Sequence, residues 1–191
     1  MADDWVPTDW NVIEPVYAEL EHRELASTLE VEEGLLELSE VDSLIGGVAS
    51  RRYSATACNT EDQEAERLHL DYQTKVLPEV AKVGDRLTRK YLACEHRHGL
   101  DRDYWQVHDR DAERAVEIFR EENVDLDAKD EELAVEYGRI SGSMTVEFEG
   151  RVCTLQEMSK HLENTDRQHR EQAWRLVSER RLQDRVVLDE L

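Results

Sequence analysis

The chain is 191 residues long, which suffices for one domain with a hydrophobic core and is too short for two of ordinary size. Its formal net charge is −21, so nucleic acid and anionic membrane surfaces are excluded as partners, because their phosphates would be repelled. Residues 1–50 hold thirteen acidic residues and one arginine, which predicts a solvated acidic helical face or, alternatively, a surface for basic peptides or a basic partner.

The sequence predicts a cytoplasmic location. No apolar run approaches the roughly 20 residues that span a bilayer. The first ten residues lack the cationic and apolar regions of a secretory signal. Three cysteines, Cys58, Cys94 and Cys153, are an odd number at wide spacing, which fits reduced core thiols better than a disulfide framework.

The chain begins with two predicted helices. The first starts at about Asp9, whose carboxylate is well placed as a cap. The second covers Val31–Leu44, and Gly46-Gly47 is the expected break or bend after it. The pattern leaves open whether residues 48–57 continue that helix.

A long helix is predicted next. Thr60 followed by Gln63 has the spacing of a capping box, so the helix should start there. Apolar residues then recur at helical spacing through residues 61–95, with a kink at Pro78, and Gly99 ends the element. We expect it to be the spine of the N-terminal part.

Two shorter helices should follow. One starts at Asp101 or Asp103 and stops around Asn123. Residues 125–127 then form a linker or cap, and residues 131–140 a second helix.

A β-hairpin is predicted over Ser143–Thr154. Met144, Val146 and Phe148 alternate with polar residues and therefore share one face of a strand. Gly150 can supply the positive φ that a two-residue turn requires, so the register is set locally.

Two helices with capping boxes follow the hairpin, with Thr154 paired to Glu157 and Thr165 to Gln168. The first should cover residues 155–163. Its expected buried residues are Leu155, Met158 and Leu162.

The second of these helices is predicted to run to Leu191 without a stop signal, since no Gly, Asn or Pro closes it. Its last turns are still apolar, with Val186, Val187 and Leu188. These side chains should be covered either by an earlier helix or, as we expect, by sequence that is absent.

Together these elements predict an all-α fold, an elongated helical lobe with one inserted β-hairpin near residues 143–154. We expect a division into residues 1–125, a helical region with a long central helix, and residues 126–191, which hold a helix, the hairpin and the two capped helices.

No catalytic, cofactor-binding or metal-binding residue is predicted. None of the seven histidines is followed by Glu, so the His-Glu-x-x-His motif of zinc peptidases is absent. Cys94, His96 and His98 form the one compact ligand-like cluster, read mainly as a packed thiol with two solvent-facing histidines. Ser141-Gly142-Ser143 lacks the frame of a nucleophile elbow and is read as the corner between helix and strand. Carboxylate pairs such as Glu147 and Glu149 carry little information in so acidic a chain.

The second half of the chain resembles a known family, the oligoendopeptidase F branch of zinc oligopeptidases, relatives of thimet oligopeptidase. The similarity covers roughly residues 55–191. The residues that match the family's hairpin and following helices are Val146, Phe148, Gly150, Thr154, Leu155, Asp166, Arg167, Arg170 and Ala173.

The resemblance implies an elongated helical lobe that forms one wall of a substrate channel, within a cytosolic zinc endopeptidase that cleaves oligopeptides. The family's zinc ligands and catalytic Glu lie downstream of the matched region. The expected partner of this chain is therefore a missing C-terminal catalytic domain that binds zinc, and the chain alone should be inactive. Two alternatives are a stand-alone helical interaction module that docks through Val186–Leu191 and a small metal-binding protein or enzyme that uses Cys94, His96 and His98.

Overall fold

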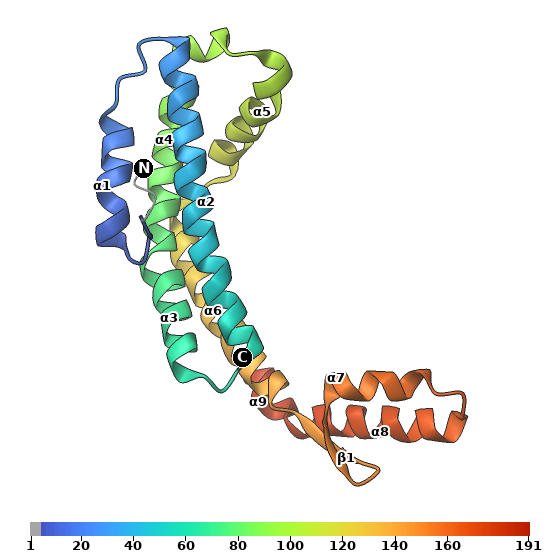
Figure 1. The fold of residues 1–191 in the computed structure, drawn as a ribbon. Helices are drawn as coiled ribbons and strands as arrows, with labels where there is room; N and C mark the ends of the chain where they lie inside the picture. The colour runs from blue at the N-terminus through green and yellow to red at the C-terminus, as the bar shows by residue number, and fades with distance from the viewer. Residues whose placement is uncertain (1–4) are drawn as a thin grey trace.

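The computed structural model describes residues 5–191, which are mostly helical with a two-stranded antiparallel hairpin. The helices form an elongated body, and the hairpin and the following helices project from one end (Figure 1). The predicted fold class is therefore confirmed. The elements are α1 Trp10–His22, α2 Thr28–Cys58, α3 Gln63–Lys75, α4 Leu77–Ala93, η1 Glu95–Gly99, α5 Arg102–Ile118, α6 Glu121–Gly142, β1 Thr145–Phe148, β2 Arg151–Thr154, α7 Leu155–Met158, η2 Ser159–Glu163, α8 Arg167–Gln183 and α9 Arg185–Glu190.

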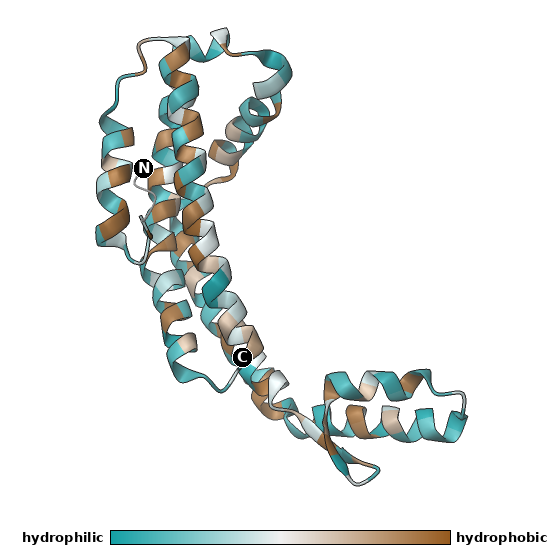
Figure 2. Cartoon of the chain, viewed as in Figure 1, coloured by the Kyte–Doolittle hydropathy of each residue, from teal (hydrophilic) through white to brown (hydrophobic). Residues whose placement is uncertain are grey.

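The main hydrophobic core lies where α1, α2, α3 and α4 meet. Hydrophobic residues recur along these helices with hydrophilic residues between them, as an amphipathic pattern requires (Figure 2). We call the helices α1–α6 the bundle. The buried residues of its main core are Ile13, Tyr17, Leu20, Val41, Ile45, Val48, Tyr72, Val76, Val83 and Leu87.

The polar groups in this core are paired. The Tyr17 hydroxyl donates to Asp42 at 2.7 Å, and the Tyr72 hydroxyl donates to the Pro7 carbonyl at 3.0 Å. Burial raises the pKa of both tyrosines and of the Asp42 carboxyl. Each hydroxyl can therefore be buried without an unmet hydrogen bond.

A second cluster closes the far end of the bundle, where α5 packs against α4 and the start of α2. The Tyr91 hydroxyl donates to Asp109 at 2.6 Å, and the Trp105 indole N–H to Glu32 at 3.3 Å. The buried residues of this cluster are Val31, Tyr91, Leu100, Trp105 and Ala112.

The predicted break at Gly46-Gly47 is wrong, because α2 continues through both glycines to Cys58. Residues 48–57 therefore belong to the same helix. The neighbouring Ile45 and Val48 are buried in the main core. That burial outweighs the roughly 0.5–1 kcal/mol that a glycine costs inside a helix.

The start of α3 also differs from the prediction. Thr60 lies in a turn, and the N-cap is Asp62, whose carboxylate accepts from two first-turn N–H groups at 3.0 and 3.1 Å. The predicted long helix over residues 61–95 is divided at Val76 into α3 and α4. The bend expected at Pro78 is thus a break, with the proline in the first turn of α4, where its missing N–H costs nothing.

The boundaries predicted between α5 and α6 are wrong. Asp101 does cap α5, but that helix ends at Ile118, and α6 runs without interruption from Glu121 to Gly142. The linker expected at residues 125–127 is helical, with the buried Val124 beside it. The division expected between residues 125 and 126 falls inside α6, and the hydrophobic clusters part instead at the end of this helix.

Residues 143–183 form the second part of the molecule, which we call the hairpin unit. Val146 pairs with Cys153, and Glu149 and Gly150 make the turn with φ of 51° and 75°. Met144, Val146 and Phe148 are buried on one face, as the alternation predicts. The core of the unit consists of Val146, Phe148, Cys153, Met158 and Ala173.

One of the two predicted capping boxes is present. Glu157 accepts from the Thr154 N–H at 2.7 Å, and Thr154 Oγ1 accepts from the Glu157 N–H at 3.2 Å. The box at Thr165 is wrong, because Asp166 caps α8 and accepts from the Gln168 N–H at 2.9 Å.

The ends of these helices differ from the prediction as well. Only Leu155–Met158 is α-helical in the first, and a 3₁₀ turn follows in which Leu162 is 39% exposed rather than buried. α8 stops at Gln183, so the uninterrupted helix expected to reach Leu191 is replaced by α8 and the short α9.

Candidate functional site

Two hollows lie beside α3 and α6, and residues from the end of α2 and the start of α9 help to line them. A groove with a volume of about 910 Å³ lies between α3, α6 and the α8–α9 junction, and we call it the α3–α9 groove. A second hollow of about 390 Å³ is lined by α2, α3 and α6, and we call it the His69 pocket. The two share the lining residues Thr60, Glu66 and Arg139 and are therefore neighbours; we call them together the depression.

A buried histidine and a carboxylate form the wall of the His69 pocket. His69 of α3 is only 1% exposed, and its Nε2 lies 2.8 Å from Glu131 Oε1 of α6. The Tyr53 ring of α2 lies beside it, with centroids 5.9 Å apart. The Nδ1 atom of His69 is buried without a hydrogen-bond partner. Three helices therefore bring an imidazole, a carboxylate and an aromatic face to one place.

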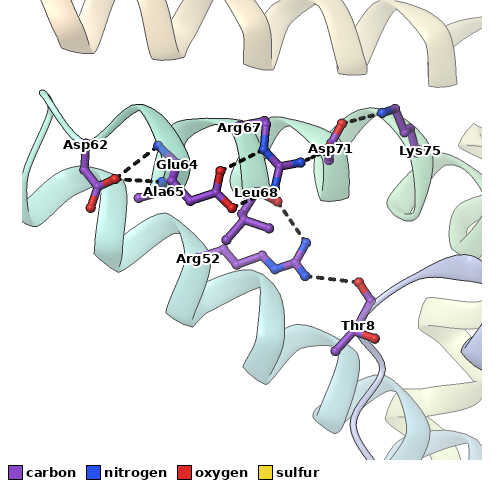
Figure 3. A network of polar contacts seen from close by, with 9 residues as sticks. All are labelled: Thr8, Arg52, Asp62, Glu64, Ala65, Arg67, Leu68, Asp71 and Lys75. Atoms are coloured by element: carbon purple, nitrogen blue, oxygen red, sulfur yellow. Dashed lines mark hydrogen bonds and ion pairs between the residues drawn. The ribbon is translucent and has the colours of Figure 1, made fainter.

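A network of ion pairs fixes the α3 side of this region. Arg67 donates to Glu64 at 2.9 Å and to Asp71 at 2.8 Å, and Lys75 also pairs with Asp71 (Figure 3). The hydrogen bonds to these cations lower the pKa of the Glu64 and Asp71 carboxyls. Exposed pairs of this kind contribute little to stability individually, but here they balance the positive charge of Arg67.

Arg52 ties α3 to α2 and to the N-terminal segment. Its guanidinium donates to the Leu68 carbonyl at 2.8 Å and to the Thr8 carbonyl at 3.1 Å (Figure 3). It also lies over the Tyr72 ring, 4.6 Å from the centroid. The backbone on which His69 is placed is thereby held against α2.

The depression is negatively charged because its cations are already paired. Arg139 donates to Glu136 at 3.0 Å and Arg180 to Asp184 at 2.6 Å, in addition to the pairs of Arg67. Within residues 5–191, no ion pair is formed by Glu61 or Glu66, which also line it. A cationic group is therefore the ligand that its charge favours.

The cluster of Cys94, His96 and His98 is not assembled into a site. The Cys94 thiol contacts the Leu25 carbonyl at 3.5 Å, whereas His96 and His98 are exposed in η1. Within residues 5–191, no group of three or more His, Cys, Asp or Glu residues has an arrangement that could hold a metal ion. The three cysteines are free; Cys153 is buried, but Cys58 is exposed, so its prediction as a core thiol is wrong.

Ser141-Gly142-Ser143 forms the corner between helix and strand, as predicted. The Ser143 hydroxyl donates to the Ile140 carbonyl at 2.8 Å, which closes the helix end. A Cβ on Gly142 would lie 3.2 Å from the Thr60 side chain, so the glycine allows α6 to approach the turn before α3 closely. Glu147 is exposed on β1.

The hairpin unit contains a second histidine cluster. His161 Nδ1 and His169 Nε2 lie 3.0 Å apart, and His169 Nδ1 lies 3.4 Å from Glu149 Oε1. The Phe148 ring contacts both imidazoles, with centroids 4.7 and 5.1 Å away. Both imidazoles therefore pack against Phe148, a residue of the small core.

Sequence reasoning missed His69 and Glu131. One signal was available, because His69 precedes Tyr72 by three residues and so shares the inward face of α3. A histidine on such a face needs a partner when buried. The partner could not be found in advance, because Glu131 lies 62 residues away along the chain.

Large hydrophobic side chains are exposed along α8 and α9. Trp174 is 61% exposed, and Leu182 and Val186 are 64% and 68% exposed. Val187 and Leu191 continue the series. We call these five residues the α8–α9 apolar face. Val186 and Val187 are exposed as expected, whereas Leu188, for which a cover was also expected from outside the chain, is half-buried.

Comparisons with known proteins found no match for this chain. No family model matches the chain, no curated protein is similar to it, and no solved structure matches it. None of the helices within residues 5–191 is long and apolar enough to cross a bilayer.

Proposed function

We propose that this chain is the helical, channel-wall part of a cytoplasmic zinc endopeptidase that cleaves oligopeptides. A separate catalytic domain of the oligoendopeptidase F type would be its partner and would supply the zinc. None of the chain's histidines is followed by Glu, so the residues present do not fit a zinc site of that type. The chain is therefore expected to be inactive alone.

The observation that carries this proposal is the α8–α9 apolar face. Five large apolar side chains are exposed within residues 174–191, and exposed apolar surface of this kind is a candidate site for binding another polypeptide. Trp174 is the kind of large aromatic residue that dominates binding energy in interfaces. Trp174 and Leu182 of this face belong to the hairpin unit, whose residues carry the resemblance to the oligoendopeptidase F branch.

The α3–α9 groove supports the same proposal. It is open, negatively charged and about 910 Å³ in volume, which suits part of an extended peptide. Val187 lines the groove as well as belonging to the apolar face. A domain bound on that face would therefore border the groove and could complete a channel.

The proposal is tested by restoring peptide cleavage. We would mix the chain with a zinc-loaded catalytic domain of the oligoendopeptidase F type and follow a quenched fluorescent oligopeptide that contains no arginine. Cleavage should require both proteins. Formation of a complex without cleavage would count against the proposal.

A matched pair of variants sharpens this test. Leu182 on the apolar face and Leu29 on α2 are 64% and 63% exposed, so glutamate should be tolerated equally in the isolated chain. Leu182→Glu should reduce the restored cleavage by about tenfold or more, because a charge would be buried in the interface. Leu29→Glu should leave it unchanged.

The second candidate function is a stand-alone helical interaction module. It is favoured by the completeness of the bundle, whose two clusters are buried without help from another chain. In that case the apolar face would bind a protein partner, Leu182→Glu would still weaken binding, and no zinc domain would yield cleavage.

A further inference from the structure

The His69 pocket presents hydrogen-bond acceptors and an aromatic face to whatever enters it. Glu131 accepts from His69 Nε2–H, and its side chain is 30% exposed and lines the pocket, so it is partly accessible. Glu66 and Asp62 add two further carboxylates to the lining, and that of Asp62 caps α3. The Tyr53 ring is 60% exposed and offers its electron-rich face.

His69 itself completes this set. When Nε2–H donates to Glu131, the other ring nitrogen, Nδ1, has a lone pair and accepts. That atom is buried and has no partner, an uncommon condition for a polar group in a protein interior. Because His69 lines the pocket and a buried unpaired acceptor is costly, a ligand N–H group that reached Nδ1 would remove that cost.

The one cation in the pocket lining does not compete for these groups. Arg139 donates to Glu136 through Nε and Nη2, at 3.0 and 2.7 Å. Its charge is therefore offset by a carboxylate outside the set. The net charge of the other residues that line the pocket is negative.

We propose that the His69 pocket binds the guanidinium group of an arginine side chain in an oligopeptide. This inference rests on the proposed function for the peptide nature of its ligand. A guanidinium carries five N–H donors and no acceptor, so it complements a pocket that offers the carboxylates of Glu66 and Glu131 and an imidazole lone pair. Its planar face can also stack on Tyr53. A lysine ammonium shares the charge but lacks the planar fork, and binds less well.

The ligand is tested with three labelled nonapeptides of alanine and glycine that differ only at the central residue, which is arginine, citrulline or lysine. Citrulline has nearly the shape of arginine without its charge. Fluorescence anisotropy should give binding of the arginine peptide at least about tenfold tighter than that of the citrulline peptide, with lysine between them. Equal binding of the arginine and citrulline peptides would overturn the proposal.

The pocket is located with a matched pair of glycine variants. Gly138 lines the pocket and Gly46 lies on an exposed part of α2, and a Cβ on either meets nothing within 4 Å. Gly138→Leu should fill the hollow and abolish binding of the arginine peptide, whereas Gly46→Leu should bind like the natural chain. Unchanged binding by Gly138→Leu would place the ligand elsewhere and contradict the proposal.

A second variant keeps the test independent of cavity filling. Glu131→Gln retains a hydrogen-bond acceptor for His69 but removes the charge, so the arginine peptide should bind about tenfold more weakly. Binding of the citrulline peptide should be unaffected. Loss of both to the same degree would indicate a structural effect and contradict the assigned role.

The outcome is separable from that of the cleavage test, because the quenched substrate used there contains no arginine. Restored cleavage with no preference for arginine would refute the pocket assignment alone. An arginine preference without restored cleavage would refute the peptidase proposal and leave the pocket in place.

Discussion

The bundle and the hairpin unit are stabilised in different ways. The bundle has two clusters of buried residues, gathered from helices far apart in the sequence. The hairpin unit has one small cluster, in which Met158 is the largest fully buried side chain, and its strands, turn and capping box are all local. The unit therefore depends on few side chains, whereas the bundle distributes its burial over many.

The largest expected effect comes from Met158→Ala. Deleting a fully buried methionine costs roughly 2–5 kcal/mol, and the small core of the hairpin unit has few other contacts to compensate. Amide hydrogen exchange should show residues 145–183 losing protection while α1–α4 keep theirs. Val152→Ala, at a position that is 74% exposed, is the control. Equal loss of protection in both regions would show that they unfold as one unit.

Alkaline pH should destabilise the bundle and not the hairpin unit, the reverse of the effect of Met158→Ala. Burial raises the pKa of Tyr17, Tyr72 and Tyr91 in the folded bundle, and the hairpin unit contains no tyrosine. The stabilisation is complete below the unfolded pKa of about 10 and is lost as pH rises above it, because only the unfolded chain ionises readily.

Tyr17 and Tyr91, whose pKa values are raised furthest, should each lower the free energy of unfolding of the bundle by up to about 1.4 kcal/mol per pH unit in that range. Urea titrations between pH 9 and about 11.5, read by exchange in each region, measure the slope. Tyr17→Phe should reduce the slope of the bundle by about one tyrosine's share. A slope that Tyr17→Phe leaves unaltered would contradict the role given to its burial.

The smallest expected effects come from two glycines, with opposite signs. Gly46→Ala should stabilise the bundle by about 0.5–1 kcal/mol, because it lies inside α2 with open space for a Cβ. Gly150→Ala should destabilise the hairpin unit by up to about 2 kcal/mol, because the glycine has a φ of 75° and alanine is strained in that left-handed conformation. Thermal melts of the two variants measure both shifts, and stabilisation by both substitutions would contradict the turn geometry.

The same contrast explains which parts of the fold the sequence could predict. The hairpin was predicted with its inward face and turn, because alternation and Gly150 are local signals. The path of α2 through Gly46-Gly47 was not, because burial of Ile45 and Val48 by other helices decides it. Asp62 and Asp166 replaced the predicted threonine caps, since both residue types can cap and the sequence alone does not select between neighbours.

The candidate site was less accessible to prediction than the fold. The exposure of Val186 and Leu191 could be anticipated, because apolar residues recur in the last turns and the sequence pattern showed no helix that would pack on them. The His69 pocket depends on side chains from α2, α3 and α6 meeting in space, and no local pattern reports such a meeting.

The central claim is that the α8–α9 apolar face receives a zinc-bearing catalytic domain. Hydrogen–deuterium exchange of the chain, with and without such a domain of the oligoendopeptidase F type, tests this most directly. The account predicts that exchange slows by about tenfold or more over residues 174–191 and is unchanged over α1 and α5. Unchanged exchange over residues 174–191 at concentrations where the two proteins bind would contradict it.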